Sequence, residues 1–234
     1  MVAEFPPEPS GSWARPTDGK AGTYMNSSGN RKSTSEKIAL EIKNQKEEIR
    51  SKMRRWRNSL SIVHSQRASH EVLTILSHWD IYQKCSNIGC FISFDGEIAT
   101  QPIIRQILDD QKHCFLPRLK PYKPNRLWFL PYTLGSQLEN NKYGIPEVST
   151  PLNQAIAISK LDILLMPLVA FDNTGNRLGM GAGYYDITLS QIENVKRPKL
   201  VGLAYQEQIY DKLPIDELDI KLDAVITPEN FYQF

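Results

Sequence analysis

The order of hydrophobic patterns predicts an α/β fold in three layers, α/β/α, with a mostly parallel or mixed central sheet. Three observations predict it: two amphipathic helical stripes open the domain, short apolar strand-like runs follow, and helical patterns lie between those runs. Strands that alternate with helices favour parallel pairing, because parallel strands need long crossover connections. In such sheets, ligands bind where the carboxyl ends of strands meet the following loops.

The size and composition of the chain are those of an ordinary globular protein. Its 234 residues suffice for one large α/β domain or two small ones, with 41% hydrophobic and 23% charged residues. The net charge of +2 is too close to zero to indicate a polyanionic partner by itself. The sequence has no run of about 18 apolar residues, so we expect no membrane span. Three cysteines without CxxC spacing favour a reducing compartment over a disulfide framework or a zinc site.

The first 32 residues differ in composition from the remainder. They are rich in proline, glycine and serine and lack periodicity, which predicts a disordered tail over 1–32 and a single α/β domain over 33–234. The tail contains Glu4, Glu8 and Asp18, whereas an organellar presequence is acid-poor, and it lacks an apolar secretory core. We therefore expect a cytoplasmic protein, with a mitochondrial location as the alternative.

Two amphipathic helices are predicted at the start of the domain. Ser33 and Glu36 have the spacing of a capping box. The first apolar stripe consists of Ile38, Ile42, Ile49, Met53, Trp56 and Leu60. The second stripe consists of Val72, Ile75, Leu76, Trp79 and Tyr82. Lys46 and Arg50 lie on the charged face of the first helix, and a face of this kind is most often simply solvated.

Six apolar runs predict strands. They are Ile88–Phe94, His113–Leu116, Leu127–Leu130, Leu161–Phe171, Leu200–Tyr205 and Ala224–Thr227. Further helices are predicted after Thr100, which can cap a helix with Pro102 in its first turn, and near Tyr184. The loops that follow the first, second and fourth of these strands are where a ligand site is expected.

The most informative segment is MPLVAFDNTGNRLGMGAGYYD. Its glycines Gly179, Gly181 and Gly183 lie between a buried strand and a predicted helix, where main-chain N–H groups can approach an anion. Arg177 can supply a bidentate contact to phosphate, and Asp186 can hold a magnesium ion against phosphate oxygens. The spacing is neither the dinucleotide GxGxxG fingerprint nor the Walker loop. A tight strand-to-helix turn without a ligand is therefore the alternative.

This segment resembles the signature of the 5-formyltetrahydrofolate cyclo-ligase family, FDxxGxRLGxGxGYYD after an apolar strand. Three further segments are similar to elements of that family in the same order. They are KEEIR at 46–50, FISFDGEI at 91–98 with FLPR at 115–118, and YQEQ at 205–208 with LDAVIT at 222–227. The resemblance covers about residues 36–228, and several elements in order are more specific than one motif. It implies the layered α/β architecture that sugar-phosphate isomerases and CoA transferases also use.

The resemblance implies an ATP-dependent cyclisation with Mg²⁺ as cofactor. In it, 5-formyltetrahydrofolate becomes 5,10-methenyltetrahydrofolate through a phosphorylated formyl group that N10 attacks, with release of ADP and phosphate. The implied partners are ATP and 5-formyltetrahydrofolate, without nucleic acid or membrane. A monomer is the expected state.

Matching positions carry the family's roles over to this sequence as expectations. The ATP-binding residues are expected to be Lys46, Arg50, Arg177, Leu178, Gly179, Met180, Gly181, Ala182, Gly183, Tyr184 and Tyr185. Arg177 and Tyr185 are the expected catalytic residues. The folate is expected to contact Ile92, Glu97, Met180, Gly181, Ala182, Gly183 and Tyr184. Asp186 and Asp219 are the expected metal ligands.

Two positions in the glycine turn depart from the family pattern, because relatives often have basic residues where this chain has methionine and alanine. Arg118, Lys120 and Lys123 are the candidates to offset the missing charge. Simpler interpretations also stay open for single residues. Glu97 can be an ordinary turn residue after Asp-Gly, Asp219 can belong to a generic acidic loop, and the paired tyrosines can be core.

Two other functions stay open. A sugar-phosphate isomerase or a CoA-transferase-like enzyme would use the same scaffold, since a fold does not fix its chemistry. A non-catalytic RNA-binding protein would use the basic segment 43–57. That segment includes Glu47 and Glu48, however, and no aromatic stacking platform accompanies it.

Overall fold

The computed structural model describes residues 34–120, 125–192, 196–216 and 219–234. The tail predicted over 1–32 lies outside the described residues, as does Ser33 of the expected capping box. The helices are α1 (Thr34–Arg57), α2 (Ile62–Ser77), α3 (Asp80–Lys84), α4 (Gln101–Asp109) and α5 (Tyr184–Leu189), with 3-10 turns at Leu152–Gln154, Ile158–Lys160 and Gln206–Gln208. None of the helices in this part of the chain has the length and apolar character needed to cross a bilayer.

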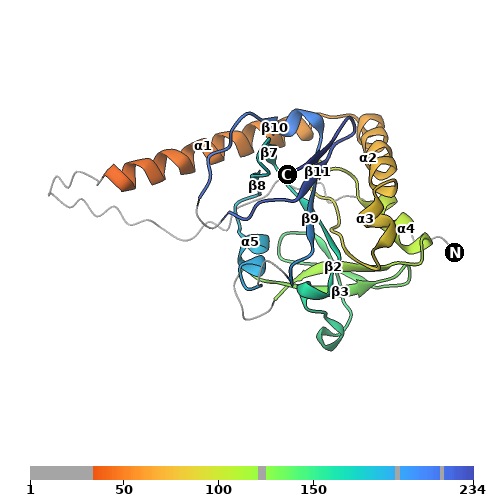
Figure 1. Ribbon diagram of the computed structural model, residues 1–234. Helices are drawn as coiled ribbons and strands as arrows, with labels where there is room; N and C mark the ends of the chain where they lie inside the picture. The colour runs from red at the N-terminus through yellow and green to blue at the C-terminus, as the bar shows by residue number, and fades with distance from the viewer. Residues whose placement is uncertain (1–33, 121–124, 193–195, 217–218) are drawn as a thin grey trace.

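A seven-stranded mixed sheet forms the centre of the fold (Figure 1). Its strands are β1 (Asn87–Gly89), β2 (His113–Leu119), β3 (Leu127–Tyr132), β6 (Ile163–Pro167), β9 (Lys199–Leu203), β11 (Ala224–Ile226) and β12 (Phe231–Gln233). They run in the order β12-β11-β9-β6-β1-β2-β3, in which the inner strands pair in parallel and the edge strands β3 and β12 pair antiparallel. The predicted α/β fold is confirmed, and of the two predicted kinds of sheet, mostly parallel or mixed, the structure has the mixed one.

Two smaller sheets accompany the central one. The first joins β7 (Ala170–Asp172), β8 (Arg177–Leu178) and β10 (Ile209–Tyr210) in the order β10-β7-β8. The second pairs β4 (Leu138–Asn140) with β5 (Pro146–Val148). The β7–β8 hairpin leads directly into the glycine turn, so this small sheet sets where that turn lies.

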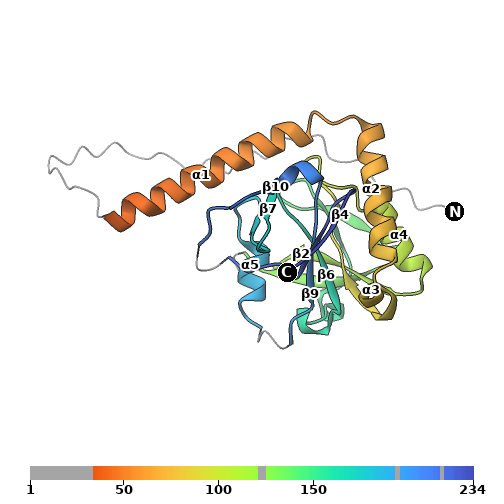
Figure 2. The ribbon, with the colours of Figure 1, turned by 45° about the horizontal axis from the view of Figure 1, so that its top comes forward.

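Separate apolar clusters cover the two faces of the central sheet. On one face, α2 and α4 bury Val72 and Ile103 against the strands. On the other, Leu189 of α5 and Phe171 of the small sheet join the second cluster. The helix α1 lies alongside the small sheet, with Ile49 packed against its apolar residues (Figure 2). The layer that covers this second face of the central sheet is therefore built from helices and a small sheet together, rather than from helices alone.

The helix α4 begins where the sequence predicts, but its cap differs. Thr100 occupies the N-cap position and Pro102 lies in the first turn. The Thr100 hydroxyl makes no capping hydrogen bond; it donates to the Phe91 carbonyl and accepts from the Ser93 N–H. The hydroxyl therefore fixes the chain that follows β1.

The strand predicted over Ile88–Phe94 is shorter in the structure. Only Asn87–Gly89 pairs with the neighbouring strands, while residues 90–94 are buried without forming a strand. Phe91 and Ile92 line a cavity instead. The prediction was wrong here because a buried apolar run looks the same whether it packs in a sheet or lines a site.

The longest predicted strand, Leu161–Phe171, is two strands in the structure. The strand β6 ends at Pro167, which has no N–H to continue the ladder, and β7 belongs to the small sheet. The carbonyl groups between them accept hydrogen bonds from the side chains of Arg57 and Gln208. The sequence also missed β12, which follows the run predicted as the last strand and closes one edge of the sheet.

Candidate functional site

A cavity of about 520 Å³ lies at the carboxyl ends of β1, β2 and β6. Cofactor and substrate pockets commonly enclose roughly 300–1,000 Å³, so the cavity is large enough for a substrate. Its lining comes from α1, from residues within 91–97 and 141–147, from the glycine turn with the start of α5, and from Asp216 and Asp219. The loops that the sequence singled out therefore converge on one place.

The glycine turn needs glycine for conformation at two of its three positions. Gly181 has φ +97 and Gly183 has φ +68, a region that side chains other than glycine rarely enter. Gly179 has no such requirement, and a Cβ added there would meet no atom within 4 Å. Gly179, which lines the cavity, therefore leaves open space beside its main chain.

Arg177 and Asp186 line the cavity but pair with each other. The Arg177 Nη2 lies 2.6 Å from the Asp186 Oδ1, and its Nη1 donates to the Ile220 carbonyl. The Ile220 N–H donates in turn to the Asp186 Oδ1 at 3.2 Å. The Arg177 side chain is buried, so in this structure it braces the two loops that flank the site.

Lys46 and Arg50 are not part of a solvated face. Lys46 Nζ lies 2.7 Å from Asp216 Oδ2 and 2.6 Å from Asp219 Oδ2, and only 8% of its side chain is exposed. Arg50 Nε donates to the Gly179 carbonyl at 2.9 Å. Both side chains therefore hold α1 against the acidic loop and the glycine turn. Asp216 was not predicted as a site residue.

The expected metal ligands lie in the same cavity. Asp186 and Asp219 both line it, although no cluster of three His, Cys, Asp or Glu side chains suited to a metal ion occurs among the described residues. Proteins commonly hold Mg²⁺ through one or two carboxylates together with substrate phosphates and water. Two carboxylates in the lining of a cavity of about 520 Å³ fit that arrangement.

The expected folate contacts, Ile92 and Glu97, also line the cavity. Glu97 belongs to a turn, because its N–H donates to the Phe94 carbonyl at 3.2 Å and its Oε2 accepts from the Phe94 N–H at 3.1 Å. The turn interpretation and the cavity position therefore hold together, since the turn directs a buried carboxylate into the lining.

Tyrosines close another part of the wall. The Tyr184 hydroxyl lies 3.1 Å from that of Tyr143, a residue the sequence did not single out as functional. Burial raises the pKa of Tyr184, and the hydrogen bond with Tyr143 raises it further. Burial, followed by the charge of Glu97, raises the pKa of Tyr185. Both phenols are therefore neutral at ordinary pH and can donate a hydrogen bond but cannot act as bases.

Two of the basic residues expected to offset Met180 and Ala182, Arg118 and Lys120, do not reach the site. Arg118 donates to the carbonyl groups of Val148 and Thr150, and Lys120 Nζ lies 4.2 Å from the centre of the Trp128 ring. Neither lines the cavity, and Lys123 lies outside the described residues. Met180 and Ala182 themselves do line it.

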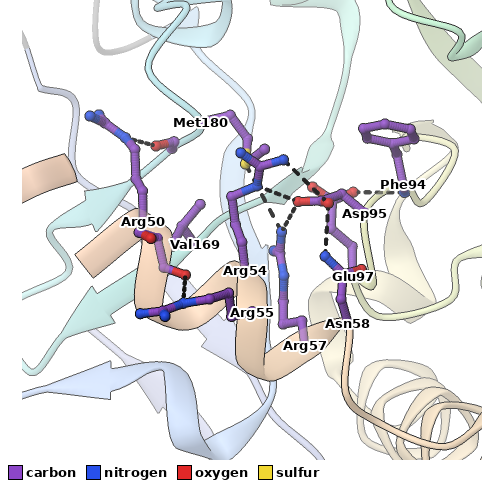
Figure 3. A network of polar contacts seen from close by, with 12 residues as sticks. Arg50, Arg54, Arg55, Arg57, Asn58, Phe94, Asp95, Glu97, Val169 and Met180 are labelled. Carbon is purple, nitrogen blue, oxygen red and sulfur yellow. Dashed lines mark hydrogen bonds and ion pairs between the residues drawn. The ribbon is translucent and has the colours of Figure 1, made fainter. Parts of the chain in front are cut away.

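A buried ionic cluster next to the site was also missed (Figure 3). The Asp95 carboxylate accepts hydrogen bonds from Arg54 and Arg57 in the last turn of α1 and from Asn58, which follows the helix. Burial alone would raise the pKa of Asp95, but hydrogen bonds from Arg54 and Asn58 and the charges of the two arginines hold it below its usual range. The only sequence signal was Asp-Gly after an apolar run, which indicates a turn.

The fold and this site define an α/β enzyme with a cavity that basic side chains, acidic side chains and the glycine turn line together. A model of the 5-formyltetrahydrofolate cyclo-ligase family matches residues 42–228, and the chain belongs to this family. The resemblance inferred from the motifs is therefore confirmed. The isomerase, CoA-transferase and RNA-binding alternatives have no support from these matches.

Individual relatives agree with the family match. The 5-formyltetrahydrofolate cyclo-ligase of Escherichia coli K12 is 37% identical over 182 residues, which are 78% of this chain and all of that protein. The mouse enzyme of the same name is 31% identical over 196 residues, covering 80% of this chain and 96% of that one. The solved structure of Aquifex aeolicus 5,10-methenyltetrahydrofolate synthetase has a TM-score of 0.70 at 28% identity, covering 80% of this chain and 92% of that one.

Proposed function

We propose that this chain converts 5-formyltetrahydrofolate to 5,10-methenyltetrahydrofolate with consumption of ATP, in the cavity described above. One observation carries the proposal: the glycine turn, the basic residues of α1 and Glu97 all line the same cavity. A reaction between a nucleotide and a second substrate requires that both be bound side by side with water excluded. The names of the relatives describe this substrate or this product.

The nucleotide phosphates are proposed to bind between α1 and the glycine turn. Lys46 and Arg50 supply positive charge, and the open space at Gly179 allows a phosphate oxygen to approach the main chain. Asp186 and Asp219 are proposed to hold a magnesium ion that accompanies ATP, which would supply charge neutralisation at the phosphates. Lys46 must then exchange its two carboxylate partners for phosphate oxygens.

The folate is proposed to contact Ile92, Glu97 and the turn from Met180 to Tyr184. Its formyl oxygen attacks the terminal phosphorus of ATP, and the bond between that phosphorus and the bridging oxygen of ADP breaks. The folate N10 then attacks the activated formyl carbon and loses its proton, and phosphate leaves with the former formyl oxygen. Placing the two substrates and neutralising phosphate charge is the main task of the protein.

The two expected catalytic residues are proposed to act by positioning and hydrogen bonding. Arg177 keeps the Asp186 carboxylate in place beside the phosphates. Tyr185 stays a neutral phenol because burial raises its pKa, so it can donate a hydrogen bond to a phosphate oxygen. Neither residue needs to exchange a proton during the reaction.

The proposal is tested by mixing the purified full chain with Mg·ATP and 5-formyltetrahydrofolate. We expect growth of the methenyltetrahydrofolate absorbance, with one ADP formed for each product molecule. Reactions without ATP or without the folate are the controls. Folate-independent ATP hydrolysis, or no absorbance change with folded protein, would refute the proposal.

The compartment and the oligomeric state stay predictions. A cytoplasmic location was expected, with mitochondria as the alternative, and one relative from Arabidopsis thaliana has mitochondrial in its name at 27% identity over 169 residues. Fractionation of cells that express the tagged full-length chain distinguishes the two locations. Light scattering of the purified chain tests whether it is a monomer.

A further inference from the structure

One face of α1 connects the two proposed halves of the site. Lys46, Arg50, Arg54 and Arg57 are spaced by four, four and three residues, so they lie on one side of the helix along about 16 Å of its axis. The first two contact the acidic loop and the glycine turn. The last two contact Asp95, which lies in the turn that contains Glu97.

Both carboxylate oxygens of Asp95 accept hydrogen bonds from side chains at or just after the end of α1 (Figure 3). Its Oδ2 accepts from Arg54 Nε at 2.6 Å and from Arg57 Nη2 at 3.1 Å, while its Oδ1 accepts from Asn58 Nδ2 at 3.0 Å. Asp95 has φ +55, a strained conformation for a residue other than glycine. A Cβ added at the next residue, Gly96, would lie 3.0 Å from the Arg57 carbonyl oxygen. The turn is therefore held against the end of α1 both by charge and by close packing.

The same turn orients the Glu97 carboxylate. Glu97 Oε2 accepts from the Phe94 N–H at 3.1 Å, and the Glu97 N–H donates to the Phe94 carbonyl at 3.2 Å. Asp95 lies between these two residues. A shift of Asp95 relative to α1 must therefore also shift the carboxylate proposed to contact the folate.

Arg57 extends the connection to the glycine turn. Its side chain has no exposed surface; Nη1 donates to the Leu168 carbonyl at 3.1 Å and Nη2 lies 4.0 Å from the Met180 sulfur. Its Nε has no hydrogen-bond partner within the described part of the chain. A buried ion pair is seldom more stable than well-packed apolar side chains of the same volume. Stability alone therefore does not account for this arginine.

We propose that Asp95 is a positioning residue through which α1 couples the nucleotide part of the site to the folate part. Nucleotide phosphates that bind Lys46 and Arg50 fix α1, and α1 fixes the Asp95 turn and with it Glu97. Each substrate then binds more tightly when the other is present, by the same factor in both directions. This inference rests on the proposed function and adds the residue that links its two substrates.

The coupling is measured from equilibrium binding of 5-formyltetrahydrofolate to the full chain, with and without a non-hydrolysable ATP analogue. In the wild type, the analogue is expected to tighten folate binding by about tenfold, within the usual range for coupled sites. Asp95→Asn keeps the shape of the side chain and removes its charge, and Arg54→Met removes one donor whose side chain is 27% exposed. In both variants the ratio of the two folate affinities is expected to fall to about 1–2.

Arg67→Met is the matched control. Arg67 also pairs with a carboxylate, that of Glu71, but its side chain is 79% exposed and it lies on α2 outside the cavity. The ratio of affinities in this control is expected to equal that of the wild type.

Asp95→Asn leaves Arg57 without its charged partner, so the melting temperature of this variant is expected to fall by about 5–10 °C. Arg54→Met leaves Asp95 with Arg57 and Asn58 and is expected to stay folded.

The outcomes separate a positioning role from a purely structural one. A lower melting temperature with an unchanged ratio of affinities in Arg54→Met would overturn the inference, because the cluster would then only stabilise the fold. A wild-type ratio of one, with catalysis intact, would overturn the inference and leave the proposed function standing. Wild-type protein that binds no folate would overturn both.

Discussion

Replacement of Gly179 by alanine separates a ligand-binding glycine from a structural one. An added Cβ at this position meets no atom within 4 Å, and its φ does not lie in the left-handed region. The free protein should therefore accept the methyl group, and a smaller entropy of the unfolded chain adds about 0.4–1 kcal/mol of stability. For a domain of this size, the melting temperature should rise by about 1–4 °C.

The expected effect on ATP is opposite in sign. A phosphate oxygen hydrogen-bonded to the main chain lies about 2.9 Å from nitrogen, whereas contact with a methyl carbon requires about 3.5 Å. Loss of one hydrogen bond to a charged group corresponds to about 1.5–3 kcal/mol, or roughly a 10- to 100-fold weaker nucleotide affinity. Calorimetric titration with an ATP analogue measures it, and thermal unfolding measures stability on the same sample.

Gly181→Ala serves as the comparison. At φ +97, with the Arg50 guanidinium carbon 3.3 Å from the added Cβ, alanine is strained and the protein should lose about 1–2 kcal/mol. Unchanged nucleotide affinity in Gly179→Ala would refute the assignment of the glycine turn to phosphate. A loss of stability in Gly179→Ala comparable with that of Gly181→Ala would show that the folded protein has no room for a Cβ at residue 179.

Three further predictions concern charge, pH and packing. Asp219→Asn should raise the KM for Mg·ATP about tenfold, because it removes an expected metal ligand. Asp216→Asn removes only an exposed partner of Lys46 and should change this KM by less than about twofold. Equal effects of the two substitutions in steady-state kinetics would contradict the metal assignment. Because the folded pKa of Asp95 is lowered, its contribution to stability is present above about pH 4 and is lost as pH falls through the lower folded value. The difference in urea midpoint between the wild type and Asp95→Asn should therefore shrink below about pH 4, and a constant difference would contradict the ion cluster. Gly202→Ala should lower the free energy of unfolding in urea by about 1–3 kcal/mol, because the added Cβ would lie 2.5 Å from a leucine methyl carbon. Gly135→Ala, where the added Cβ meets no atom within 4 Å, should change it by less than about 0.5 kcal/mol. Similar changes in both variants would contradict the packing around Gly202.

The candidate site could be predicted where its signal is local. The spacing of the glycines and the helix that begins at Tyr184 are properties of one short segment, and both appear in the structure where the sequence placed them. The pairing of Lys46 with Asp216 could not be predicted, because the two residues lie 170 positions apart and Lys46 is only one of many charged residues on its helix. The Tyr143 contact and the Asp95 cluster were missed for the same reason.

The sequence by itself determined the α/β class, the family and the glycine segment as the candidate site, but it left a mostly parallel and a mixed sheet both open. Periodicity, glycine spacing and ordered motifs are all carried by neighbouring residues, so they can be read without coordinates. Only the tertiary structure decided that the apolar run after β1 lines a cavity, that Pro167 divides a predicted strand, and that Arg57 is buried against Asp95. These outcomes depend on which distant groups meet, and the free energy of burying a charge or a carbonyl group is fixed only when its partner is in place.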